Sequence, residues 1–275
     1  MTDPAGHRPL VAFTSLAIAG AGLVSASAYF ELVHGLVSPS ALAAGAVLLA
    51  AGLLVSLGHL GQKRRAALAV RGAGRSALSN EALLFGVALA AAAIAAAAGL
   101  SGARAPVLAA VAGAANAAFL VSIGLVYSVR GQRTWRGFSV LAPLTGGLAL
   151  GAISVQTTAG IGGTFVGTLL VIAIDALVFS QRWRDITGIG LSGRMLADPW
   201  QLRRTQLLAA RFFLLDAIPF FLLVTTPTPL AVPLAAAGLM VDRVSFYALA
   251  LQHTTEHEIE GVEAQLAAPD RAEQD

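Results

Sequence analysis

Long stretches without any charged residue dominate this sequence. A transmembrane helix needs about 20 mostly apolar residues, so each of these stretches has room for at least one crossing of a membrane. Charged residues make up only 12% of the chain, about half the share of a soluble domain. We therefore expect an integral membrane protein. The charge-free stretches are residues 9–30, 32–62, 82–103, 105–129, 137–174 and 217–241.

Two of these stretches are predicted to form two helices each. Residues 137–174 are too many for one crossing at a rise of about 1.5 Å per residue, and the polar, Gly-rich QTTAGIGG (156–163) is the natural turn. The prolines of TTPTP (225–229) break the stretch 217–241 in the same way. The predicted spans are 10–30, 40–59, 81–100, 106–127, 138–156, 163–180, 206–226 and 229–251.

The predicted fold class is thus an all-α integral membrane bundle of about eight transmembrane helices. An even number of crossings places both termini on the same side of the membrane. The bundle is expected to occupy residues 1–253. The acidic, polar segment 254–275 is predicted to be a soluble tail.

Lysine and arginine are unevenly distributed among the predicted loops. The loops 60–80, 128–137 and 181–205 carry five, three and five of them, whereas the loops on the other side carry only Arg104. Loops rich in Lys and Arg remain in the cytoplasm, so both termini and the three basic loops are expected there. The basic balance predicts contact with anionic membrane lipid or with a partner protein, and not with nucleic acid.

The residue inventory limits the cofactors that the chain can hold. The sequence has no Cys, which excludes disulfides and any cysteine-ligated iron–sulfur cluster in this chain. Its five His lie at or beyond the ends of the predicted spans, where they do not supply paired haem ligands. The segment HTTEH (253–257) matches a zinc pattern, with His253 and His257 as ligands and Glu256 as base. A polar exit from the last helix is the favoured interpretation, and a haem protein and a zinc-dependent membrane hydrolase are alternatives.

The stretch HLGQKRRAALAVRGAGRSALSNE (59–81) joins the second and third predicted spans. It places His59 and Glu81 at the same membrane face, because successive helices joined by one loop end and begin on one side. Ser79 is a plausible N-cap, which would put Glu81 in the first turn, where the helix dipole favours an anion. Alternatively, Glu81 exchanges a proton with a lipid-soluble substrate, and His59 hydrogen-bonds it. The residues alone leave the two interpretations about equal.

Five charged residues fall within predicted spans, where such residues are costly and often functional. Arg211 and Asp216 are five apart and Asp242 and Arg243 are adjacent, so neither pair is expected to share a helix face. We expect ion pairs between helices, and for Asp175 and Asp216 this structural role is favoured. Arg243 and Tyr247 do share a face, and for them a structural and a functional role are equally plausible. The same charges support a proton-coupled secondary transporter as an alternative function.

Four fragments resemble the membrane-anchor subunit of the dimethyl sulfoxide reductase family. The main one is HLG…RA followed by G-x-S-A-L-S-N-E, through His59, Leu60, Gly61, Arg65, Ala66, Gly74 and residues 76–81. The other fragments are PLVAFT (9–14), VYS (126–128) with TW (134–135) and Pro143, and DRVSFY (242–247).

The resemblance implies a haem-free, all-helical anchor in the cytoplasmic membrane of a bacterium or archaeon. Such a subunit holds a molybdopterin catalytic subunit and a four-cluster iron–sulfur subunit, and exchanges electrons with menaquinone or ubiquinone. The chain itself is then expected to carry no haem, iron–sulfur cluster, molybdopterin, metal ligand or catalytic residue. The expected quinone-binding residues are Glu81, His59, Arg65, Ser79, Asn80, Arg243 and Tyr247. The expected docking residues are Lys63, Arg64, Arg71 and Arg75.

Overall fold

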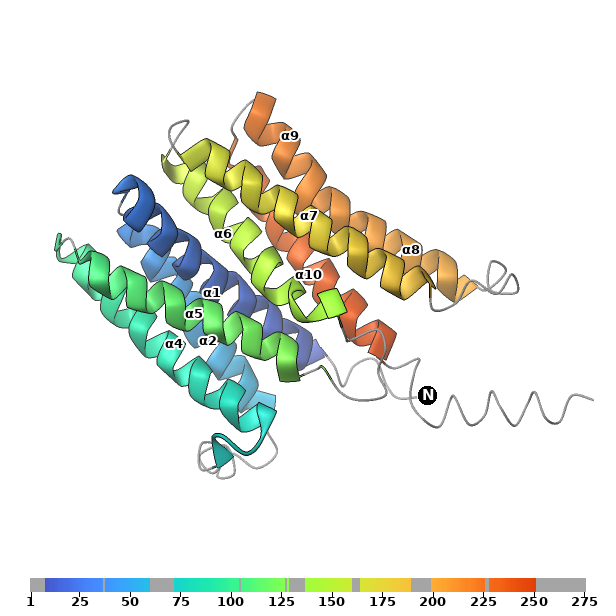
Figure 1. Cartoon of the computed structure of the whole chain (residues 1–275), viewed down its shortest axis with the longest axis horizontal. Coiled ribbons are helices and arrows are strands. Elements are labelled where there is room, and N and C mark those ends of the chain that lie inside the picture. The colour runs from blue at the N-terminus through green and yellow to red at the C-terminus, as the bar shows by residue number, and fades with distance from the viewer. Residues whose placement is uncertain are drawn as a thin grey trace, which may run out of the picture.

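The computed structural model of the chain is a bundle of helices (Figure 1). It describes residues 8–36, 38–59, 72–103, 105–126, 128, 137–159, 164–188, 199–225 and 228–250. All regular structure within these ranges is helical, which confirms the predicted all-α fold. The α-helices are α1 (Arg8–His34), α2 (Pro39–His59), α4 (Ala77–Leu100), α5 (Pro106–Val126), α6 (Ala142–Ala159), α7 (Thr164–Gly188), α8 (Pro199–Phe212), α9 (Ile218–Thr225) and α10 (Ala231–Ala250). A 3-10 turn, η4 (Gly137–Val140), precedes α6, and a π-helical turn, η6 (Phe213–Ala217), joins α8 to α9.

Six helices are long and apolar enough to cross a membrane, with mean hydropathies between 1.8 and 2.3. They are α1, α2, α4, α5, α7 and the continuous rod formed by α8, η6 and α9. The chain is therefore a multi-pass membrane protein. The predicted spans 138–156 and 229–251 coincide with α6 and α10, which are not among these six, so the total of eight spans stays a prediction. The predicted tail 254–275 lies outside the described residues.

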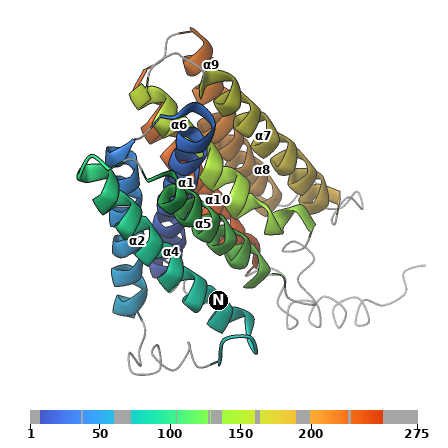
Figure 2. The same cartoon turned by 60° about the vertical axis from the view of Figure 1, so that its left-hand side comes forward.

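Helix α1 lies between two groups of helices (Figures 1 and 2). Helices α2 and α5 pack on one side of it, and α4 packs on both of these, so that α2, α4 and α5 form the first helix group. Helices α6 and α10 pack on its other side, with α7, α8 and α9 beyond them, and these five form the second helix group. In α1, 67% of the most apolar window is buried, against 28% in α2 and in α4. The first helix of the chain is therefore the central element of the bundle.

Glycines let α1 approach its neighbours at backbone distance. A Cβ added at Gly20 would lie 2.7 Å from the carbonyl oxygen of Gly45 in α2. A Cβ at Gly22 would overlap the backbone of Gly147 in α6, and one at Gly151 would overlap the backbone of Gly22. Close packing of this kind is how membrane helices associate, because lipid tails remove the hydrophobic drive between apolar side chains.

Large apolar side chains cover the outside of the bundle. Leu54, Val107 and Val166 are each more than 70% exposed, as expected for side chains whose solvent is lipid. Inside the first group, the ring of Phe85 in α4 lies 5.0 Å from that of Phe119 and 5.9 Å from that of Phe13, between centroids. These three rings connect α4 to α5 and to α1.

The rod of α8 and α9 contains a π-helical turn whose cause is visible in the sequence. Pro219 has no N–H to donate to the carbonyl of Leu215, and its ring crowds that carbonyl. The helix widens there, and the N–H of Ile218 bonds to the carbonyl of Phe213, five residues back. Gly238 of α10 faces this turn, since a Cβ added there would lie 2.6 Å from the nitrogen of Leu215. The widened turn therefore packs directly on the backbone of α10.

Candidate functional site

The N-terminus of α4 is fixed by hydrogen bonds among the residues that lead into it. Ser76 is the N-cap, with extended backbone angles, and its Oγ accepts a 3.1 Å bond from the N–H of Ser79. The Ser76 hydroxyl also donates to the Ser79 Oγ at 2.9 Å, and the Asn80 Oδ1 accepts from the N–H of Gly74 at 2.6 Å. Gly74 has a φ of +81°, which favours glycine at this turn. The predicted N-cap at Ser79 is therefore wrong: the helix starts at Ala77.

This shift changes what the helix terminus does for Glu81. Glu81 becomes the fifth residue of α4, and the first turn contains no acidic residue. The helix dipole acts mainly on the first turn, so capping no longer accounts for this carboxylate. Glu81 is 6% exposed, and its Oε1 is buried without a hydrogen-bond partner among the described residues. It lies one helical turn before Phe85, on the face that packs towards α1 and α5.

The other residues expected to bind quinone or to dock partners fall in several places. His59 is the last residue of α2, and nothing is described of its side chain. Arg75 is exposed in the turn before α4. Arg243 and Tyr247 are buried in α10, which packs on α6, α8, η6 and α1, whereas α4 packs on α5 and α2. Lys63, Arg64, Arg65 and Arg71 lie outside the described residues.

The structure thus brings Ser79, Asn80 and Glu81 together but leaves Arg243 and Tyr247 in the second helix group. The hydrogen bonds of Ser79 and Asn80 hold the turn that sets the start of α4. In this position both residues orient Glu81 through the backbone. Glu81 is the only one of the three whose buried polar atom lacks a partner within the described part of the chain.

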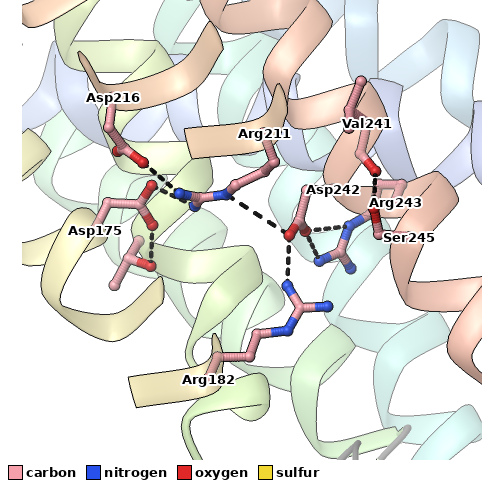
Figure 3. A network of polar contacts seen from close by, with 9 residues as sticks. Asp175, Arg182, Arg211, Asp216, Val241, Asp242, Arg243 and Ser245 are labelled. Carbon is pink, nitrogen blue, oxygen red and sulfur yellow. Dashed lines mark hydrogen bonds and ion pairs between the residues drawn. The ribbon is translucent and has the colours of Figure 1, made fainter. Parts of the chain in front are cut away.

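The second polar place is a buried network of arginines and aspartates in the second helix group (Figure 3). None of its six charged side chains is more than 2% exposed. Three positive and three negative formal charges cancel, so their mutual attraction offsets part of the cost of placing charge in an apolar surrounding. The members are Asp175 and Arg182 from α7, Arg211 from α8, Asp216 from η6, and Asp242 and Arg243 from α10.

Arg211 lies at the centre of this charge network. Its Nη2 bonds to Asp175 Oδ2 at 2.5 Å, its Nη1 bonds to Asp216 Oδ2, and its Nε lies 3.7 Å from Asp242 Oδ1. The hydroxyl of Thr145, from α6, donates to the other oxygen of Asp175 at 2.5 Å. The Arg211 guanidinium also lies 4.4 Å from the ring centroid of Phe179, a cation–π distance. One guanidinium therefore bridges three aspartates on three elements.

Asp242 is the second branching point. Its Oδ1 accepts from Arg182 Nη1 at 2.5 Å, and its Oδ2 accepts from Arg243, from Nε at 3.1 Å and also from Nη2. The ring of Phe246 covers both cations, with its centroid 4.9 Å from the Arg243 guanidinium and 5.8 Å from that of Arg182. Asp242 is accordingly the carboxylate on which Arg182 and Arg243 depend within the described helices.

Two ion pairs form between residues whose spacing did not predict them. Arg211 and Asp216 pair because the π-helical turn, which contains Asp216, brings residues five apart onto one face. Asp242 and Arg243 pair although they are adjacent, because the long arginine side chain folds back to the carboxylate. The expected pairing between helices is present as well, from Arg211 to Asp175 and from Arg182 to Asp242.

Arg182 is the network member that falls in a predicted loop, 181–205. Helix α7 continues to Gly188, beyond the predicted end of its span at residue 180, and Arg182 is 1% exposed. The spacing to Asp175 is seven residues, or about two turns, which puts both on one face of a helix. That spacing was the available signal for a charged face of α7 directed into the bundle.

Further ligand sites are limited within the described residues. No group of three or more His, Asp or Glu side chains there is arranged to hold a metal ion. The HTTEH segment lies outside them. A cavity of about 10 Å³, room for about one water, adjoins Glu31 of α1 and Gly99 at the far end of α4. It is too small for a quinone ring.

The fold and these two places define, among the described residues, an all-helical, multi-pass membrane protein with the unpaired carboxylate of Glu81 near a helix end and a neutral charge network inside. No family model, no curated protein and no solved structure matches the chain. The resemblance to the anchor subunits of the dimethyl sulfoxide reductase family therefore depends on the residues quoted above.

Proposed function

We propose that the chain is the membrane anchor and quinone-reactive subunit of a molybdopterin, iron–sulfur oxidoreductase complex. It would exchange electrons between the quinone pool and an iron–sulfur subunit docked on its basic loops. Both termini and these loops would lie on the cytoplasmic side of a bacterial or archaeal membrane, in an eight-helix bundle. The support is the motif of residues 59–81 together with the burial of Glu81, whose Oε1 lacks a hydrogen-bond partner among the described residues.

The observation that carries the proposal is the buried carboxylate of Glu81. A buried oxygen without a hydrogen bond costs about 1–3 kcal/mol, so its retention needs a reason. Helix capping is not that reason, because Ser76 caps α4 and Glu81 lies beyond the first turn. An acceptor without a donor suits a ligand that carries a hydroxyl, and a quinol is such a ligand at this depth. We infer that Glu81 accepts this hydrogen bond.

The chemistry that follows is proton transfer at Glu81. A quinol supplies two electrons and two protons on oxidation, and the electrons leave for the cluster of the partner subunit. The Glu81 carboxylate takes up the two protons one after the other and passes each to water at the basic loop. In the opposite direction the protonated Glu81 delivers two protons in turn and is reprotonated by water between them. Ser79 and Asn80 hold the turn that positions Glu81, and Arg75 is exposed beside it for docking.

The test is Glu81→Gln in the complex purified from membranes with its partner subunits. We expect the complex to assemble, and quinol-linked turnover to fall at least tenfold, because the amide takes up no proton. The matched control is Glu31→Gln, which alters a buried glutamate, 8% exposed, beside the opposite end of α4. Normal quinol-linked turnover in assembled Glu81→Gln complex contradicts the proposed role.

A second candidate is a proton-coupled secondary transporter, which the buried charge network favours. Charged residues inside the membrane mark ion and proton pathways in transporters. This candidate predicts solute uptake driven by a proton gradient in vesicles that contain the chain alone. The anchor proposal predicts no such uptake, and predicts that the neighbouring reading frames encode a molybdopterin subunit and a four-cluster iron–sulfur subunit.

A further inference from the structure

The three aspartates of the charge network differ in how many of their carboxylate oxygens accept a hydrogen bond. Both oxygens of Asp175 are bonded, one to Thr145 and one to Arg211. Both oxygens of Asp242 are bonded as well, to Arg182 and to Arg243. Asp216 has one oxygen on Arg211, and its Oδ1 is buried without a partner among the described residues. Asp216 is therefore the network carboxylate with one oxygen, Oδ1, that accepts no hydrogen bond from the described residues.

The network also differs in what it loses when each aspartate becomes neutral. Arg211 keeps Asp175, and the nearby Asp242, if Asp216 loses its charge. Neutral Asp242 would instead leave both Arg182 and Arg243 without the carboxylate that they bind. Removing one partner of a buried ion pair is strongly destabilising, since it leaves a buried charge uncompensated. Neutral Asp175 would also leave Arg211 with two aspartates, but both oxygens of Asp175 already accept hydrogen bonds. Asp216 is thus the position that can lose its charge without leaving a cation unpaired and without giving up a bonded oxygen.

We propose that Asp216 is a proton-exchange site inside the membrane, separate from Glu81. A proton from water adds to Asp216 Oδ1 and forms an O–H bond, and the formal charge of the network changes from zero to +1. Release of the proton restores the neutral network. The ligand of this site is a proton, and no oxidant, reductant or further group takes part.

Helices α6, α7, α8, α9 and α10 pack on η6, which carries Asp216. Among the described residues their buried charged groups are Arg211 from α8, Asp175 and Arg182 from α7, and Asp242 and Arg243 from α10. Helix α6 contributes the hydroxyl of Thr145, and the sequences of α6 and α9 contain no ionisable residue. Arg211 is the only cation bonded to Asp216 within these elements. The hydrogen bond from Arg211 therefore orients the aspartate while Oδ1 stays free to be protonated.

The network offers a polar route from Asp216 towards one end of the bundle. Its bonded side chains run from Asp216 through Arg211 and Asp242 to Arg182 (Figure 3). Helix α7 ends at Gly188, six residues after Arg182, or about 9 Å along the axis. Nε of Arg211 and of Arg182 each lack a hydrogen-bond partner among the described residues, so both are open to bridging water. The proposed exchange is therefore with the aqueous side at the end of α7.

Asp216 lies in the π-helical turn η6. Single π-turns inside α-helices are frequent at functional sites, because they present side chains and backbone groups out of the regular register. Pro219 fixes this turn, and Gly238 lets α10 approach it. Asp216 therefore lies on the least regular part of its rod, where α10 packs closely on the backbone.

The test is infrared difference spectroscopy on the whole chain in lipid, without quinone or partner subunits. The background is the double variant Glu31→Gln, Glu81→Gln, which removes the buried glutamates of α1 and α4 among the described residues. A pH jump is expected to produce the carbonyl stretch of a protonated carboxylic acid, shifted in D₂O. Addition of Asp216→Asn should abolish it, while Asp216→Glu should retain it at a shifted frequency.

Two results would overturn the proposal. One is the absence of a pH-dependent carboxylic acid band in the background protein, and the other is an unchanged band after Asp216→Asn. If Asp216→Asn fails to fold, Asp216→Glu decides, because a titrating carboxyl at this position must alter the frequency. The outcome is independent of quinone turnover, so failure of the role of Glu81 and failure of this proposal are told apart.

Discussion

Asp242→Asn is expected to destabilise the protein more than the same change at Asp216. Asp242 binds Arg182 at 2.5 Å and also Arg243, and both cations are at most 1% exposed. The amide keeps the size of the side chain but removes the charge that compensates them. Loss of one partner from a buried ion pair costs about 3–5 kcal/mol, and here two cations lose the same partner.

Asp216→Asn provides the scale for this prediction. It takes one carboxylate from Arg211, which retains Asp175 at 2.5 Å. The expected cost is that of one hydrogen bond to a charged group, about 1.5–3 kcal/mol. Asp242→Asn should therefore melt at the lower temperature of the two. The assay is thermal unfolding of the purified variants in one detergent. The quantity measured is the fraction of protein that remains monodisperse after heating.

A compensating change separates charge from packing. Asp242→Asn combined with Arg182→Gln removes one anion and one cation, and is expected to recover part of the stability lost by Asp242→Asn alone. Replacement of both partners of a buried pair is often tolerated, whereas removal of one is not. The reasoning about the network is refuted if Asp242→Asn melts with the wild type, or if Arg182→Gln lowers its stability further.

Two further predictions concern packing and the start of α4. Gly238→Ala would place a Cβ 2.6 Å from the nitrogen of Leu215 and should lower the free energy of unfolding by about 1–3 kcal/mol. Gly86→Ala, whose Cβ meets nothing within 4 Å, should be neutral or stabilising, and thermal melts compare the two variants. Ser76→Ala removes the N-cap of α4 and should cost about 0.5–2 kcal/mol, and Ser101→Ala at the exposed far end is its control in the same assay. Equal melting temperatures within either pair would contradict the packing or capping role.

The membrane character of the fold was predictable because hydrocarbon imposes a simple rule. Backbone groups in lipid must bond within their own segment, so long charge-free stretches indicate helices. The helix boundaries were less predictable. Helix α4 starts four residues before its predicted span, because the Ser76 hydroxyl oxygen accepts from the N–H of Ser79 and the Ser76 carbonyl accepts from that of Asn80. Helix α7 extends past its span because the charge of Arg182 is compensated inside the bundle by Asp242.

The charge network was only partly predictable, since it depends on contacts between segments far apart in sequence. The sequence showed that Asp175, Arg211, Asp216, Asp242 and Arg243 lie in apolar segments and need partners. It did not show which partner each one takes. The assumption of regular helix geometry excluded the bond between Arg211 and Asp216, and a proline three residues after Asp216 was the sign that this geometry fails.

The two polar places of the bundle differ in the way that their proposed roles require. Glu81 lies near a helix end, outside the charge network, and its Oε1 is buried without a hydrogen-bond partner among the described residues. Asp216 lies within a rod, among compensating charges. Helix α1 separates the two groups, and its glycine contacts with α2 and α6 hold them close. Each carboxylate can therefore be altered without touching the neighbours of the other, so quinone turnover and buried proton exchange are open to independent measurement in one protein.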